Sequence, residues 1–180
     1  MICSKRFLYR GVNPSLFEEN SGELVPKSKG HPFEMGAFLD ANSFFDTGLG
    51  YDMSSRNATI LHEQDSSVYR TSGISTTPCI KIAKNYATNN GKYSYGYIYI
   101  IDRNLLEQHN VLHYTVANYA TQPKIPINQE IILVDQSFGR LPSQIINKVI
   151  RVGKCCDWII YYWMALRDQA QQFFRLFYKT

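Results

Sequence analysis

The sequence has no long hydrophobic run. Its longest apolar stretch, Trp158 to Leu166, is far shorter than the roughly 20 residues that a helix needs to span a bilayer. The first segment, Met1 to Arg10, contains only Phe7-Leu8-Tyr9 as an apolar run, which is too short for a secretory signal peptide. We therefore expect a soluble domain that has no membrane partner.

The chain also lacks a strong excess of one charge. Its 180 residues include 19 Lys plus Arg and 15 Asp plus Glu, a formal net charge of +4. This mild excess suits an anionic ligand, but the basic residues are scattered, which disfavours a nucleic-acid-binding domain. A hydrophobic share of 44%, with 11 Gly and 7 Pro, excludes disorder, collagen and coiled coil. We expect one globular domain over residues 1–180 that buries its own core.

Two common kinds of binding motif are missing. There is no G-x-G-x-x-G and no Walker-type glycine-rich loop, so a dinucleotide would not be bound as in a Rossmann fold. The histidines lack carboxylate or cysteine neighbours at ligand spacing, which argues against a zinc site. These are His31, His62, His109 and His113.

Cysteine is scarce, with four residues: Cys3, Cys79, Cys155 and Cys156. The adjacent pair is poorly placed to form a disulfide with itself, because a trans peptide does not give the required geometry. Nothing near this pair indicates a lowered thiol pKa, so we interpret it as packed thiols rather than a nucleophile. The sequence thus predicts free thiols in a reducing compartment.

The hydrophobic pattern predicts an α+β domain with a mostly antiparallel sheet. Strands are expected at 7–11, 67–71, 73–77, 95–102 and 130–134, with one or two more within 143–152. Helices are expected near 13–19, 34–39, 78–88 and 104–108, whereas the polar stretch 48–65 is expected to be a loop with at most a short helix.

The C-terminal segment is strongly aromatic. Apolar residues at near-helical spacing predict a helix over 157–178 that packs on the sheet. A helix that binds a partner or lies on a membrane surface is the alternative.

Three short motifs follow one another in an order that carries chemical meaning. Arg10 closes the first strand, Ser75-Thr76-Thr77 precedes a helix, and Asn128-Gln129-Glu130 follows a long loop. This order resembles the cholera-toxin-like mono-ADP-ribosyltransferases, which have an arginine, a Ser-Thr-Ser or Ser-Thr-Thr strand, and a glutamate that ends an acceptor-recognition turn. The resemblance covers residues 7–152. It is supported by the stretches 21–27, 97–101 and 141–145.

The resemblance implies an ADP-ribosyltransferase-like fold, with a split antiparallel sheet and flanking helices, and NAD as substrate without a metal. Arg10 would grip the NAD pyrophosphate with its guanidinium fork. Glu130 would stabilise the positive charge that develops on the nicotinamide ribose as nicotinamide leaves. Ser75 would hold this glutamate and contact the ribose. Gly11, Thr76 and Thr77 complete the expected NAD-binding set.

The sequence departs from arginine-modifying relatives at Asn128. Alternation along a strand would place Asn128 on the same face as Glu130, where those relatives carry a second glutamate. Because asparagine cannot ionise, the residue favours a neutral acceptor: a hydroxyl or carboxamide side chain, or a nucleobase. Gln129 and Tyr119 are the other residues expected to recognise the acceptor.

We therefore expect a secreted or translocated bacterial toxin or effector that acts as a monomer in the target-cell cytoplasm. It would transfer ADP-ribose from NAD to a non-arginine acceptor, and a host protein is favoured over nucleic acid. Relatives that modify guanine or a threonine of ubiquitin are both compatible precedents. The alternatives are a guanine or nucleic-acid ADP-ribosyltransferase, an NAD glycohydrolase, and a catalytically silent binding module of the same fold.

Overall fold

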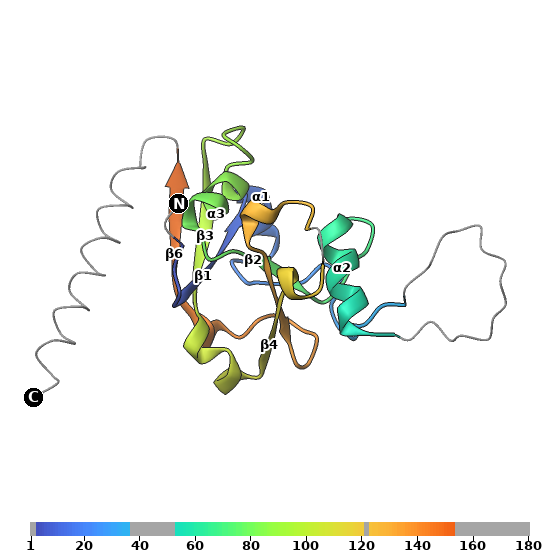
Figure 1. The fold of residues 1–180 in the computed structure, drawn as a ribbon. Coiled ribbons are helices and arrows are strands. Elements are labelled where there is room, and N and C mark those ends of the chain that lie inside the picture. Colours follow the sequence, from blue (N-terminus) through green and yellow to red (C-terminus); the bar gives the residue numbers. More distant parts are fainter. Residues whose placement is uncertain (1–2, 37–52, 121–122, 154–180) are drawn as a thin grey trace, which may run out of the picture.

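The computed structural model describes residues 3–36, 53–120 and 123–153, which form two three-stranded antiparallel sheets with flanking helices (Figure 1). The first sheet has the order β1-β3-β6, and the second has the order β2-β5-β4. The strands are β1 (Phe7–Val12), β2 (Ile74–Thr76), β3 (Tyr95–Asp102), β4 (Val111–Thr115), β5 (Ile131–Asp135) and β6 (Ile146–Gly153). This arrangement confirms the expected α+β class and is compatible with an ADP-ribosyltransferase-like fold.

A backbone bridge joins the two sheets. The amide of Tyr9 donates to the carbonyl of Thr77 at 2.8 Å, and the amide of Thr77 donates back at 3.0 Å. Since Tyr9 precedes Arg10 and Thr77 closes the Ser-Thr-Thr motif, this bridge brings two of the three predicted motifs side by side.

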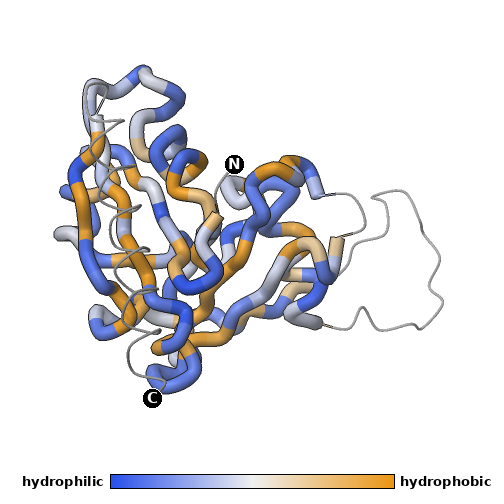
Figure 2. The backbone as a smooth tube through the Cα atoms, turned by 60° about the vertical axis from the view of Figure 1, so that its left-hand side comes forward, coloured by the Kyte–Doolittle hydropathy of each residue, from blue (hydrophilic) through white to orange (hydrophobic). Residues whose placement is uncertain are grey.

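Helix α3 (Ile80–Ala87) packs closely on the first sheet. Its buried face contains Ile80, Ile82, Ala83 and Ala87, at the spacing that predicted a helix over 78–88. A Cβ at Gly11 would collide with the carbonyl oxygen of Ala83, so only glycine fits on β1 beneath this helix. Figure 2 shows hydrophobic residues recurring along the strands and helices of the described chain.

Helix α1 (Pro14–Glu19) begins where the sequence predicts a capped helix, because the Asn13 side chain accepts a hydrogen bond from the Leu16 amide at 2.9 Å. The polar stretch 48–65 was expected to be a loop with at most a short helix, and this prediction is wrong. It contains helix α2 (Ser55–Asp65), which the Ser54 hydroxyl caps at its first turn. The helix is hard to recognise in the sequence because its buried face is not made of large apolar residues.

Three smaller predictions are corrected. Residues 34–36 are not helical, because Met35 pairs with Ser54 in an isolated bridge; the remainder of the predicted helix, 37–39, lies outside the described residues. Residues 67–71 do not form a strand: the chain turns at 66–68, where the Asp65 carboxylate accepts the Ser67 amide at 2.9 Å. In place of one helix at 104–108 there are two 3-10 helices, η1 (Arg103–Leu105) and η2 (Glu107–His109).

Cys3 and Cys79 form a disulfide, so the prediction of free thiols is wrong for these two residues. The Ser4 amide donates to the Pro78 carbonyl at 2.9 Å, which lays the N-terminal segment alongside the turn before α3 and brings the two cysteine Cα atoms within 4.4 Å. The pairing joins residues 76 positions apart, and only the tertiary fold brings them together. Cys155, Cys156 and the predicted helix 157–178 lie outside the described residues.

None of the described helices has the length and apolar character needed to cross a membrane.

Candidate active site

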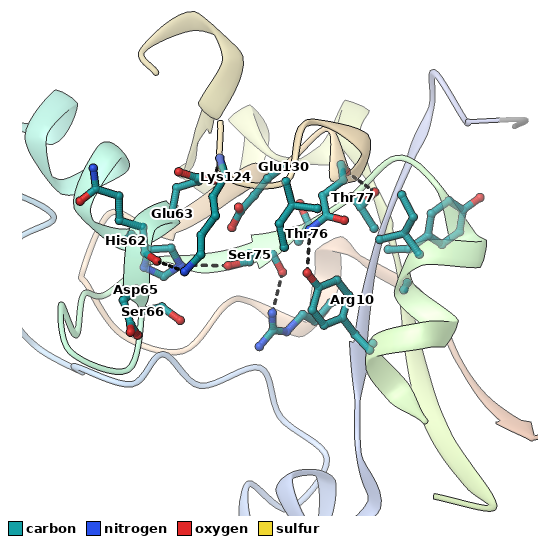
Figure 3. Close-up of a pocket in the computed structure, with 18 residues that line it drawn as sticks. Arg10, His62, Glu63, Asp65, Ser66, Ser75, Thr76, Thr77, Lys124 and Glu130 are labelled. Carbon is teal, nitrogen blue, oxygen red and sulfur yellow. Dashed lines mark hydrogen bonds between the residues drawn. The ribbon is translucent and has the colours of Figure 1, made fainter. Parts of the chain in front are cut away.

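A cavity of about 400 Å³ opens beside the bridge between the two sheets (Figure 3). Its volume lies within the range of about 300 to 1,000 Å³ that is typical of ligand sites. Four parts of the chain line it: β1, the 75–77 segment, the last turn of α2, and the segment 124–130. Side chains from α3 close the remaining wall. Arg10, Ser75 and Glu130, which belong to three separate motifs in the sequence, therefore face one space.

His62 of α2 meets Ser75 of β2 in this cavity. The His62 Nε2 atom lies 2.9 Å from the Ser75 hydroxyl, and its Nδ1 atom lies 2.6 Å from the Thr71 hydroxyl. The Thr71 oxygen also accepts the Gly73 amide at 3.1 Å. Every group is satisfied when Thr71 donates its hydrogen to Nδ1 and His62 donates its Nε2 hydrogen to Ser75. The Ser75 hydrogen then remains available for Glu130.

His62 is uncharged in this setting. Burial disfavours its protonated form, and the nearby charges of Arg10 and Lys27 oppose it further, so its pKa falls to about 4. With one ring hydrogen, the neutral imidazole can donate to Ser75 and accept from Thr71 at the same time. His62 thus orients Ser75 without adding a positive charge to the cavity.

Glu130 lies immediately before β5, and its amide carbonyl accepts the Val116 amide at 3.0 Å. Burial raises the pKa of its carboxyl group, and the Glu63 charge acts in the same direction. A hydrogen bond from the Ser75 side chain and the charge of Arg10 lower it. Glu130 is therefore a partly desolvated carboxylate that accepts a hydrogen bond from the Ser75 side chain.

Arg10 extends from β1 toward the same serine. Its Nη1 atom donates to the Ser75 carbonyl at 3.1 Å, and Figure 3 shows Arg10 and His62 approaching Ser75 from two sides. Burial lowers the pKa of Arg10, while the charge of Glu130 raises it, and a guanidinium remains protonated under these conditions. One bond to a carbonyl leaves further N–H groups of the fork to bind an anion.

Thr76 and Thr77 line the cavity, but their hydroxyls are engaged within the protein. Thr76 donates to the Ile131 carbonyl at 2.6 Å, and Thr77 donates to the Asn128 carbonyl at 2.6 Å. These two bonds tie the Ser-Thr-Thr segment to the residues on either side of Glu130. Both hydroxyls therefore hold the backbone of the neighbouring segment.

The three residues predicted to recognise the acceptor have different outcomes. Asn128 lines the cavity, although the expected strand alternation is wrong: it ends the 3-10 helix η4 (Pro126–Asn128), and Gln129 has a left-handed backbone with φ 46°. Gln129 is exposed and does not line the cavity. Tyr119 lies against the Tyr114 ring, with centroids 6.2 Å apart, and does not line the cavity either.

Sequence reasoning missed several residues of the cavity. Nothing in the sequence around His62 indicates a role in the cavity, because α2 lacks an apolar pattern. Lys124 ties the segment between β4 and β5 to α2: its amide donates to the Glu63 carboxylate, and its Nζ donates to the Gln64 carbonyl at 2.8 Å. Tyr86 of α3 contacts Asn128. These contacts join distant segments, and no local motif indicates them.

Within residues 3–36, 53–120 and 123–153, no group of three or more His, Cys, Asp or Glu side chains is arranged to hold a metal ion.

A protein-family model described as NarE matches residues 7–133 of the 180-residue chain. The chain belongs to the NarE family. This family is related to the ADP-ribosyltransferases, which use NAD as substrate. The matched range includes Arg10, Ser75 and Glu130, the residues that face the cavity. A comparison with curated proteins found no match.

Membership of the NarE family supports a transferase that uses NAD, and the cavity has groups suited to that substrate. Arg10 offers a cationic fork for the pyrophosphate. Glu130 offers a carboxylate for a cationic ribose, and the neutral His62 adds no opposing charge.

Proposed function

We propose that this NarE-family protein is a mono-ADP-ribosyltransferase of the cholera-toxin-like class that moves ADP-ribose from NAD to a neutral, non-arginine acceptor. One observation carries the proposal: the Ser75 hydroxyl lies 2.9 Å from a buried neutral His62 and hydrogen-bonds the partly desolvated Glu130, while Arg10 holds the Ser75 carbonyl at 3.1 Å. The matched family supports the enzyme class, and the order of the three motifs supports the subclass.

The reaction follows from the charges in the cavity. The bond between ribose C1′ and the nicotinamide nitrogen breaks, and nicotinamide leaves with the electron pair. The positive charge left on the ribose is stabilised by the Glu130 carboxylate, which Ser75 orients. The acceptor then attacks C1′ and transfers its proton to Glu130, whose raised pKa makes it a stronger base than an ordinary glutamate.

The acceptor side of the cavity supports a neutral nucleophile. Asn128 occupies the position where arginine-modifying relatives have a second glutamate, and it has no charge to attract a guanidinium. Glu63 also lines the cavity, but its carboxylate accepts the Lys124 amide. We therefore propose a hydroxyl or carboxamide side chain of a host protein as the acceptor, with a threonine, such as one on ubiquitin, as the favoured case over nucleic acid.

We further propose that the protein is a toxin or effector that is secreted or translocated and then acts as a monomer in the cytoplasm of a target cell. The Cys3–Cys79 disulfide supports passage through an oxidising compartment, where such bonds form and persist.

The proposal is tested by incubating the protein with labelled NAD and a eukaryotic lysate, with and without nuclease, and following both label transfer and nicotinamide release. Glu130→Gln should abolish both signals, whereas Glu63→Gln, the matched change at another cavity carboxylate, should retain them. Label on a protein band supports the proposal, and nuclease-sensitive label moves the acceptor to a nucleobase. Nicotinamide release without transfer identifies a glycohydrolase. If the wild-type protein shows neither label transfer nor nicotinamide release, the result contradicts the enzymatic proposal and favours a binding module.

A further inference from the structure

The Asn128 side chain is held by a residue of another element. Its Nδ2 atom donates a hydrogen bond to the Tyr86 hydroxyl of α3 at 2.6 Å. Its backbone carbonyl is fixed separately, because Thr77 donates to it at 2.6 Å. Asn128 is therefore fixed by its backbone on one side and by its side chain on the other.

This contact leaves the amide oxygen open. Tyr86 accepts one of the two Nδ2 hydrogens, and Oδ1 has no hydrogen-bond partner among the residues that the structure describes. Since Asn128 lines the cavity, its free oxygen can accept a hydrogen from a molecule bound there. A site that presents a neutral acceptor oxygen favours a partner that donates a hydrogen bond.

Exposed apolar side chains lie on the acceptor side of the cavity, near Asn128. Tyr86 is 51% exposed and Ile125 is 45% exposed, and both line the cavity. Ile127, the neighbour of Asn128 in the chain, is 60% exposed. An incoming charged group would lose hydration against these side chains without gaining an opposite charge from Asn128.

We propose that Tyr86 is a positioning residue for the acceptor: it holds Asn128 so that Oδ1 accepts a hydrogen bond from an uncharged hydroxyl or carboxamide of the incoming substrate. The inference rests on the proposed transferase function and adds a specificity-determining contact to it. Tyr86 acts through Asn128 and plays no part in breaking the NAD bond.

Tyr86→Phe removes only the phenolic oxygen. Because the ring is half exposed and lies outside the hydrophobic core, the fold should be unchanged. The two rates to compare are NAD hydrolysis without acceptor and ADP-ribose transfer to small probes. The neutral probes are N-acetylthreonine amide and N-acetylasparagine amide, and agmatine is the guanidinium probe. Tyr93→Phe is the matched control, since Tyr93 is an exposed tyrosine that does not line the cavity.

Tyr86→Phe should lower transfer to the neutral probes by about fivefold to tenfold, the effect of one lost hydrogen bond, and leave NAD hydrolysis within about twofold. Tyr93→Phe should change neither rate. In an Asn128→Ala background, Tyr86→Phe should have no further effect, because the residue through which it acts is already gone.

Three results would overturn the inference while leaving the transferase intact. They are an unchanged transfer rate in Tyr86→Phe, an equal loss of hydrolysis and transfer, and an additive loss in the double variant. Two results with the wild-type protein would contradict the proposed acceptor class. One is faster transfer to agmatine than to either neutral probe, and the other is no transfer to the two neutral probes. If the wild-type protein releases no nicotinamide, the proposed function itself fails and this inference fails with it.

Discussion

The cavity has two halves that are built in different ways. The donor half consists of Arg10, His62, Ser75 and Glu130, and its residues lie on or beside strands and on the buried face of α2. The acceptor half consists of Tyr86, Ile125 and Asn128, which lie on the outer side of α3 and on or beside a 3-10 turn. His62 is 5% exposed, whereas Tyr86 and Ile125 are about half exposed.

In the proposed reaction, this difference separates the residues that cleave NAD from the residues that select the acceptor. Groups that stabilise developing charge work best when they are held rigidly and shielded from water, and the donor half meets this requirement through the sheets. The acceptor half lies at the surface, where residues can change without disturbing the core. We therefore expect mutations in the donor half to affect NAD binding and cleavage, and those in the acceptor half to affect transfer.

The largest expected effect is on the free energy of unfolding, and it comes from the Cys3–Cys79 disulfide, which lies next to both halves of the cavity. Cys79 lies between the Ser-Thr-Thr segment and α3, and its disulfide to Cys3 closes a sequence separation of 76 residues. Cys3→Ser should lower the free energy of unfolding by up to about 4 kcal/mol, measured by urea denaturation, because the unfolded chain loses this constraint. NAD hydrolysis and transfer should fall together only under conditions that unfold the variant.

The control for this prediction is chemical reduction. A reducing agent should destabilise the wild-type protein as much as Cys3→Ser does and should leave that variant unaffected. Equal stability of the variant and the oxidised wild-type protein would show that the bridge does not stabilise the fold.

The donor half should make stability depend on pH. His62 is neutral when folded, with a pKa of about 4, so between that value and the ordinary pKa near 6.5 the unfolded chain binds more protons. The stability that the protein gains by keeping His62 neutral is fully present above pH 6.5 and is lost as the pH falls toward 4. Relative to His62→Gln, the wild-type protein should lose about 3 kcal/mol of unfolding free energy across this window.

His109→Gln is the matched control, because His109 lies in η2 and does not line the cavity. The wild-type protein and this control should follow the same stability curve. If His62→Gln follows that curve as well, His62 is not buried as a neutral imidazole.

Arg10→Lys tests how the donor half holds NAD. Lysine keeps the charge but lacks the planar fork, so it cannot bind the Ser75 carbonyl and a phosphate in the same geometry. The affinity for NAD, measured by calorimetry on the Glu130→Gln background to prevent turnover, should weaken by about 2 kcal/mol, roughly thirtyfold. Arg56→Lys, at an exposed position of α2 away from the cavity, should leave it unchanged. An unaltered affinity in Arg10→Lys would exclude bidentate phosphate binding.

The smallest expected effects come from two neighbouring threonines, Thr76 and Thr77. They should distinguish the two halves most sharply, because one variant should slow NAD cleavage and the other should slow transfer. Thr76→Val removes one hydroxyl bond and should cost about 1 kcal/mol of stability. Thr77→Val also removes the bond that the Thr77 oxygen accepts from the Cys79 amide at 3.1 Å, and it should cost about 2 kcal/mol. Thr76 holds the carbonyl of Ile131, next to Glu130, so its loss should slow NAD cleavage. Thr77 holds the carbonyl of Asn128, so its loss should slow transfer and leave cleavage within about twofold. Identical profiles for the two variants would contradict the division into halves.

The sequence predicts the parts of the fold that depend on local patterns. The strand 95–102 alternates β-branched and aromatic residues and matches β3 at both ends, and the apolar spacing of 78–88 predicts α3. Arg10, Ser75 and Glu130 could be identified because each lies in a short motif whose order carries the resemblance. The structure then brings these three residues into one cavity.

Contacts between distant segments could not be predicted. His62 meets Ser75 only because α2 packs beside β2, and α2 itself buries small or polar residues that give no hydrophobic period. Asn128 faces the cavity through a left-handed turn at Gln129, which strand alternation cannot anticipate. The Cys3–Cys79 pair likewise depends on where the N-terminal segment lies in the folded chain.

The central claim is that the Glu130 carboxylate drives cleavage of NAD, and the most direct test separates binding from cleavage in Glu130→Gln. We predict that NAD binds this variant with an unchanged dissociation constant, while nicotinamide release falls by about 100-fold to 1,000-fold. The variant should be no less stable than the wild-type protein, since it removes a carboxylate whose burial raises its pKa. Cleavage at the wild-type rate in Glu130→Gln, or an equal loss in Glu63→Gln, would contradict the account.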